Sequence, residues 1–252
     1  MPYPLALDAT DESAEPLERE RRTVDALLEL STAARDRGTD EHLDLLLGHA
    51  RRTLAPYGPV EHLAAAPLPG AAPRVTTETA RVLCSLEEGA DRGPLAEALA
   101  GRPTDDVPLT DGPGQRWPEL AARARGLGLH RVVALPLCAQ TEPGGTPLGA
   151  LVVLRPQSAP LPEHARYLLG ALTVASAVQI RQRLTRERVA ELQHALDSRV
   201  LIEQVKGMLA ERSGQTPDEA FAALRHYART NRRRLHDLAR AILDGTEPGP
   251  TP

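Results

Sequence analysis

Aromatic side chains are scarce in this sequence of 252 residues: one Phe, one Trp and four Tyr together make up 2% of it. Hydrophobic residues still amount to 41%, so a core has to be built mostly from Leu, Val and Ala. Because Ala, Leu and Arg are strong helix formers, this composition favours helices over sheet. A chain of this length accommodates one large domain or two smaller ones.

Cysteine is also rare. Cys84 and Cys138 lie among apolar residues, and neither belongs to a CxxC pair or to a Cys/His arrangement with metal-ligand spacing. A disulfide framework and a zinc site are therefore not expected, and the sequence predicts two buried, reduced thiols. It predicts no metal and no cofactor.

Long apolar runs are missing as well. No stretch approaches the roughly 18 apolar residues of a membrane-spanning helix. The N-terminal residues are polar and acidic and lack the basic and apolar segments of a signal peptide. We therefore expect a cytoplasmic protein that is not inserted in a membrane.

The motifs of common enzyme classes are absent: there is no HExxH, no GxSxG and no Walker-type Gly-Lys-Ser/Thr. His130 begins an expected strand, where a lone histidine is usually structural. The Asp105-Asp106 pair lies mid-chain, whereas a receiver domain needs its acidic pair after the first strand. We predict a protein that is not an enzyme and whose input is a ligand or a partner rather than a phosphoryl group.

Hydrophobic periodicity and turn residues predict an α+β domain in the first part of the chain. Residues 130–140 and 148–156 should pair as an antiparallel hairpin at the centre of a sheet, joined by the turn-forming TEPGGTP at 141–147. The other expected strands are 59–66 and 105–110, and the expected helices are 16–37, 40–54, 76–88, 91–101 and 116–128.

A long helix should follow, because no Pro interrupts the chain from residue 163 to residue 216. Up to about residue 182 we expect it to lie against the α+β domain. Along the helix, Val178, Val189, Leu192 and Leu196 fit a heptad seam that Gln182, Thr185 and Arg199 interrupt. This pattern predicts a weak, short coiled coil as the connector.

The last fifty residues predict three short helices around one small core. Thr216, Pro217 and Glu219 have the spacing of a capping box at the start of the second helix. Asn231 is expected to cap the third helix and Gly245 to end it. The expected buried stripes are Leu201, Ile202, Val205, Met208 and Leu209, then Ala220, Phe221, Leu224, Tyr227 and Ala228, then Leu235, Leu238, Ala239 and Ile242.

The charge is divided unevenly along the chain. The whole sequence has formal net charge -4, yet residues 199–245 hold nine basic and six acidic residues. An acidic body with a basic end suggests a polyanion partner, although arginines that merely keep a helix face soluble are the alternative. Arg232, Arg233 and Arg234 crowd the expected start of the third helix, where the helix dipole disfavours cations and favours a bound anion. The candidate phosphate-binding residues are Arg199, Lys206, Arg225, Arg229, Asn231, Arg232, Arg233, Arg234 and Arg240.

Residues 198–243 carry, in order, IEQVKGML, DEAFAALR and NRRRLHDLA. This segment resembles an ANTAR domain, the three-helix RNA-binding module of bacterial transcription antiterminators. The region before it is similar to a GAF sensor domain in the stretches DRGPLAEALAGRP, RWPELAARARGLGLHRVVALPL and TPLGALVVLRP. The GAF-then-ANTAR order is typical of actinobacterial regulators.

The resemblance implies a regulator in which the ANTAR domain binds structured RNA, namely paired hairpins of a leader, and the GAF domain senses a small ligand or a partner. A DNA-binding regulator with a three-helix basic domain is the alternative, because charge alone does not separate the two. We also expect a parallel homodimer through the helices that flank the GAF-like domain and through the helix at 183–199. The expected divisions are a flexible tail at 1–15, the GAF-like domain at 16–182, the connector at 183–198, the ANTAR domain at 199–245 and a second tail at 246–252.

Overall fold

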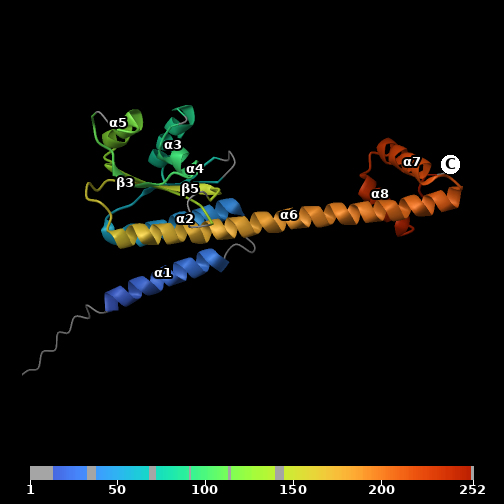
Figure 1. The fold of residues 1–252 in the computed structure, drawn as a ribbon, viewed down its shortest axis with the longest axis horizontal. Coiled ribbons are helices and arrows are strands. Elements are labelled where there is room, and N and C mark those ends of the chain that lie inside the picture. Colours follow the sequence, from blue (N-terminus) through green and yellow to red (C-terminus); the bar gives the residue numbers. More distant parts are fainter. Residues whose placement is uncertain are drawn as a thin grey trace, which may run out of the picture. The chain divides into compact units, whose positions relative to one another are not determined.

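The computed structural model describes residues 14–32, 38–67, 72–90, 92–112, 115–139 and 145–250 (Figure 1). The chain divides into two compact units, Met1–Arg183 and Leu184–Pro252. Most of the predicted tail at 1–15 and most of the predicted turn at 141–147 lie outside the described residues.

The first unit contains an antiparallel sheet and seven helical segments among its described residues. The strands are β1 (His62–Pro67), β2 (Arg74–Val75), β3 (Thr104–Pro108), β4 (Arg131–Pro136) and β5 (Gly149–Arg155). The helices are α1 (Ala14–Thr32), α2 (Thr39–Leu54), the short 3-10 helix η2 (Ala55–Tyr57), α3 (Glu78–Ala90), α4 (Pro94–Leu99), α5 (Pro118–Gly126) and the first part of α6 (Glu163–Ser213).

The sheet has the order β2-β1-β5-β4-β3, and every neighbouring pair is antiparallel. The predicted hairpin is confirmed: β4 pairs with β5, and β5 is the central strand. Gly149 begins β5 opposite Pro67, and a Cβ atom at this position would lie 2.3 Å from the Ala66 carbonyl oxygen. Only glycine therefore allows β1 and β5 to approach this closely. The edge strand β2, of two residues, was not predicted.

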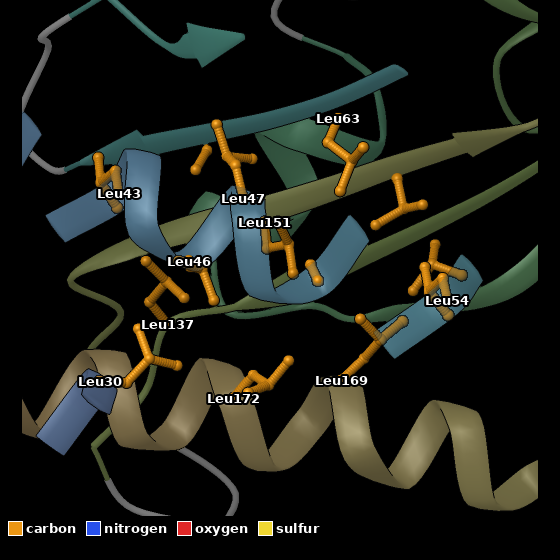
Figure 2. Packing of buried hydrophobic residues seen from close by; sticks show 14 of the residues in the cluster. Leu30, Leu43, Leu46, Leu47, Leu54, Leu63, Leu137, Leu151, Leu169 and Leu172 are labelled. Carbon is orange, nitrogen blue, oxygen red and sulfur yellow. The ribbon is translucent and has the colours of Figure 1, made fainter. Parts of the chain in front are cut away.

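Helices cover both faces of the sheet, which explains why its central strands are buried along nearly their whole length. Leucines of α1, α2 and α6 pack on one face against Leu63 and Leu151, as Figure 2 shows. Val133 belongs to the same buried cluster. Helices α3, α4 and α5 cover the other face, where Trp117 is the only aromatic residue of the buried cluster (Figure 1). The α+β prediction is confirmed.

A buried ionic cluster ties the edge strand β3 to the centre of the sheet. Asp106 has φ of 50° at a register shift between β3 and β4, and this conformation turns its side chain inward. Its carboxylate lies 3.1 Å from Arg155 Nη1 and 3.1 Å from Arg131 Nε, and it accepts a hydrogen bond from the Leu161 amide at 2.5 Å. Asp106 therefore joins three strands and the segment that leads into α6.

Helix α6 belongs to both units. It runs through 51 residues without a break, so the predicted connector and the predicted first helix of the basic domain are one helix. The prediction that its first part lies against the sheet is confirmed by buried residues as far as Ile180. Residues 184–197 are all exposed. The second unit is completed by α7 (Pro217–Thr230) and α8 (Leu235–Leu243).

Candidate nucleic-acid interface

The three helices of the second unit share one small apolar core, as the sequence predicted. The buried members are Val205, Leu209, Ala210, Ala220, Leu224, Ala228, Leu238, Ala239 and Ile242. The capping box is present: the Thr216 hydroxyl accepts from the Glu219 amide at 3.4 Å, and the Thr216 amide donates to Glu219 Oε2 at 2.9 Å. The Thr216 amide and the Thr216 hydroxyl both donate to Glu219 Oε2, and these two hydrogen bonds lower the pKa of the Glu219 carboxyl. The sequence therefore fixes the start of α7.

The prediction that Phe221 belongs to the buried stripe of α7 is wrong. Phe221 is half-buried and lies outside the core cluster, with the Arg225 guanidinium 5.6 Å from the centre of its ring. Tyr227 is also half-buried, and it does pack against the core. The core of this unit is therefore almost wholly aliphatic.

The prediction that Asn231 caps the start of the third helix is also wrong. Asn231 is the C-terminal cap of α7, and its side-chain amide donates to the Tyr227 carbonyl at 2.9 Å. The N-cap position of α8 is held by Arg234, whose side chain makes no capping hydrogen bond. The end of α8 was predicted correctly: Asp244 follows its last residue, and Gly245 takes φ of 71°.

The loop between α7 and α8 holds the three consecutive arginines. Arg232 adopts a left-handed conformation with φ of 52°, which is rare for a residue with a side chain. The Arg233 amide then donates to the Ala228 carbonyl at 2.9 Å. Arg233 thus belongs to the loop and not, as predicted, to the start of the third helix.

Every predicted RNA-binding residue lies outside the buried core. Arg199 and Lys206 lie two turns apart on α6, and Arg225 and Arg229 lie one turn apart on α7. Lys206 is half-buried and the other eight are exposed. Arg240 lies in the last turn of α8, where the helix dipole favours a cation.

Two of these cations are already paired within the unit. Lys206 Nζ lies 2.5 Å from Glu203 Oε2, and Arg233 forms an ion pair with Glu247. The remaining arginines form no ion pair with the described part of the chain; they are Arg199, Arg225, Arg229, Arg232, Arg234 and Arg240. Six guanidinium groups are therefore available to an anionic partner.

A pair of histidines borders this surface and was not predicted. The rings of His194 on α6 and His236 on α8 have centroids 5.2 Å apart, and Arg240 Nη2 lies 3.5 Å from His236 Nε2. Glu247 was also missed, because the sequence pattern of residues 246–252 indicated only a tail. No short-range motif connects Glu247 with Arg233, since 14 residues separate them.

The first unit has a cleft of about 660 Å³ beside α1 and α2. Arg22, Glu29, His49 and Arg52 contribute to its lining. His49 Nε2 lies 3.1 Å from Glu29 Oε2, and its Nδ1 lies 3.0 Å from Arg52 Nη2. Burial and then the Arg52 charge lower the pKa of His49, although Glu29 opposes them. The cleft therefore presents charged side chains of both signs around a neutral imidazole.

The described residues include no group of three or more His, Cys, Asp or Glu side chains that could hold a metal ion. None of their helices is both long and apolar enough to cross a lipid bilayer.

Comparison with known proteins identifies the second unit. The model of the ANTAR domain matches residues 190–243, which confirms the resemblance predicted from the sequence. ANTAR domains are RNA-binding modules of transcription antitermination. None of the curated proteins compared with the chain matches it.

Several solved structures are similar to the chain. The GAF domain of a Pseudomonas syringae pv. tomato protein is 21% identical, with 71% of this chain and 96% of that chain covered and a TM-score of 0.38. CepR2 of Burkholderia cenocepacia, an N-acylhomoserine lactone dependent LuxR family transcription factor, is 17% identical over 68% and 99%, with a TM-score of 0.44. A GAF domain/HD domain protein of Geobacter sulfurreducens is 17% identical over 63% and 98%, with a TM-score of 0.37.

Proposed function

We propose that the protein is an RNA-binding regulator of transcription antitermination, in which the second unit binds hairpins of a leader RNA. The observation that carries this proposal is the ANTAR match together with arginines that all lie outside the core. RNA hairpins present closely spaced phosphates, which guanidinium groups bind through charge-assisted hydrogen bonds. Hairpin loops also offer unstacked bases for side-chain contact.

The first unit is proposed to act as a GAF-like sensor of a small ligand or a partner protein. Its cleft beside α1 and α2 is the proposed place for a ligand, since it combines a large volume with side chains of both charges. No covalent attachment is proposed: Cys84 is buried, and neither Cys84 nor Cys138 forms a disulfide.

Binding is tested by comparing a labelled RNA with two stem–loops and a DNA duplex of equal length. We expect tighter binding to the RNA, with an affinity that falls steeply as salt rises, because phosphate contacts release counterions. A preference for the duplex would support the alternative, a DNA-binding regulator. If the protein prefers the RNA, sequencing of the RNA that co-purifies with it would identify its target.

The role of the arginines is tested by the double variant Arg229→Ala/Arg233→Ala. Each phosphate contact that is lost should lower the salt slope by roughly one unit and weaken binding to every RNA. Arg102→Ala/Arg123→Ala is the matched control, because it removes the same charge from exposed positions of the first unit. If the two double variants bind RNA equally well, the arginines of the second unit only keep its surface soluble.

We further propose a parallel homodimer through α6. Val189, Leu192, Leu196 and Val200 are 47%, 52%, 62% and 56% exposed. At 100° per residue they lie within about 80° of one another, on the face opposite the core residue Val205. A second copy would bury this stripe, and two RNA-binding units would raise the effective concentration for paired hairpins.

Analytical ultracentrifugation at micromolar concentration tests the dimer. Leu192→Glu should shift the protein to monomers, because a charge in the seam cannot be buried without a partner. Ala195→Glu adds the same charge on a different face of α6 and should leave the dimer intact. A parent protein that stays monomeric with and without RNA would disprove the proposal.

A further inference from the structure

The residues after α8 fold back onto the second unit. The amides of Thr246 and Glu247 both donate to the Ala241 carbonyl, at 2.9 and 3.2 Å. Gly249 is buried, and a Cβ atom there would lie 3.2 Å from Ile242 and 3.3 Å from Leu209. We call residues 246–250 the C-terminal strap.

The strap holds one carboxylate against the candidate RNA-binding surface. Glu247 Oε2 pairs with Arg233 Nη1, and Glu247 Oε1 accepts a hydrogen bond from the Tyr227 hydroxyl at 3.3 Å. A guanidinium and a hydroxyl that both donate to the two oxygens of one anion form a site that suits a phosphate equally well, since phosphate oxygens accept from the same donors. Tyr227 and Arg233 come from α7 and from the loop that follows it, beside Arg229 and Arg232.

We propose that Tyr227 and Arg233 form a phosphate-binding site and that Glu247 occupies this site until a nucleic-acid phosphate displaces it. The strap is then an autoinhibitory element of the RNA-binding surface, and the inference rests on the proposed function. The displaced contact is weak enough for this role. The Arg233 and Glu247 side chains are 39% and 20% exposed, and ion pairs that water still reaches contribute only modestly to stability.

The backbone of the strap explains why the carboxylate competes effectively although the ion pair is weak. The two hydrogen bonds to Ala241 and the contacts of Gly249 keep Glu247 beside Arg233, so its local concentration is high. Only the side chain has to rotate away when a phosphate binds. The fold of the unit therefore does not change on release.

The test is a double-mutant cycle on the full chain. Glu247→Gln keeps an acceptor for Tyr227 but weakens the competition for Arg233. It should raise the affinity for a labelled RNA with two stem–loops by about two- to fivefold, the range that one exposed ion pair supplies. Asp244→Asn is the matched control, because it removes the same charge only three positions before Glu247. Asp244 is exposed and forms no ion pair with the described residues. It should change the affinity by less than about 1.5-fold.

The cycle is closed in an Arg233→Ala background, where Glu247→Gln should no longer have an effect, because its competitor site is gone. Two results would refute the autoinhibitory role of the strap without contradicting RNA binding. One is an equal increase in RNA affinity from Glu247→Gln and Asp244→Asn, and the other is an increase from Glu247→Gln that persists in the Arg233→Ala background. A loss of affinity in Glu247→Gln would do the same, since Glu247 would then support the binding surface.

A second probe separates failure of this inference from failure of the proposed function. Polyphosphate offers phosphates without bases or hairpins. The chain could prefer duplex DNA to stem–loop RNA while Glu247→Gln, but not Asp244→Asn, improves polyphosphate binding. That result would support the phosphate-binding site and refute the proposed RNA-binding function. If Glu247→Gln leaves binding to both probes unchanged, the phosphate site falls.

Discussion

Glu87 offers a sharp test of the packing in the first unit. It lies near the end of α3 with 5% of its surface exposed, and its Oε2 accepts a hydrogen bond from the Ala96 amide at 3.0 Å. Burial raises the pKa of this carboxyl to about 7, although hydrogen bonds from the Ala96 and Leu95 amides oppose the rise. In the part of the chain that the structure describes, no ion pair includes Glu87. It is therefore a buried acid that becomes charged near neutral pH.

The raised pKa has a definite effect on stability. The folded chain binds the Glu87 proton more tightly than the unfolded chain, whose carboxyl has a pKa near 4.5. The resulting stabilisation is complete below about pH 4.5 and is lost as the pH rises through about 7. A difference of 2.5 units corresponds to about 3 kcal/mol in the free energy of unfolding.

The perturbation is Glu87→Gln, which keeps the shape and the acceptor of the side chain but cannot ionise. Its free energy of unfolding should exceed that of the parent by up to about 3 kcal/mol at pH 8, and the difference should vanish by about pH 4.5. Urea denaturation followed by fluorescence measures this directly. Trp117 is the only tryptophan of the chain and is 4% exposed in the same buried cluster as Leu95.

Glu78→Gln is the control for this experiment. Its carboxylate is 77% exposed at the start of α3, so the pH dependence of that variant should follow the parent within about 0.5 kcal/mol. If the difference between Glu87→Gln and the parent does not grow with pH, the burial of an unpaired carboxylate at this position is refuted.

Five further substitutions test the packing of both units by urea denaturation. Leu224→Ala should lower the free energy of unfolding of the second unit by about 2–5 kcal/mol, and the half-buried Phe221→Ala by about half of that; equal losses would show that Phe221 belongs to the core. Asp106→Asn should cost about 3–5 kcal/mol because it leaves a buried arginine without its partner, whereas the exposed Asp105→Asn should cost less than about 1 kcal/mol; similar values would contradict the buried cluster. Gly149→Ala should cost about 2 kcal/mol or more, because its Cβ would overlap a backbone carbonyl of β1, and a neutral result would refute the close approach of the two strands.

Local patterns were enough to predict most of the elements. The hairpin of β4 and β5 follows from two runs of β-branched and aliphatic residues, and the start of α7 follows from Thr216 and Glu219 alone. Each of these signals lies within a few residues of the feature that it specifies. The ANTAR resemblance was recognisable for the same reason, because its motifs are short and occur in a fixed order.

The errors concern features that depend on distant or unusual contacts. The left-handed turn at Arg232 places the N-cap of α8 at Arg234 and not at Asn231, and nothing in a run of three arginines indicates such a turn. The pairing of Asp106 with Arg155 spans 49 residues and has no local signature. The nine predicted RNA-binding residues stay a prediction, because exposure alone does not identify a contact.

The uninterrupted course of α6 has a consequence for how cooperatively the protein unfolds. Residues 184–197 of this helix are all exposed, and an isolated helix of fourteen residues is only marginally stable in water. Their helical state is therefore sustained from the two ends, where α6 packs in each unit. When α6 unfolds in either unit, the adjoining turns of the exposed segment lose the packed helix that keeps them helical. The unfolding of one unit therefore lowers the stability of the helix that leads into the other. The segment is thus a thermodynamic link whose strength is set by helix propensity, and a proline within it would let the two units melt independently.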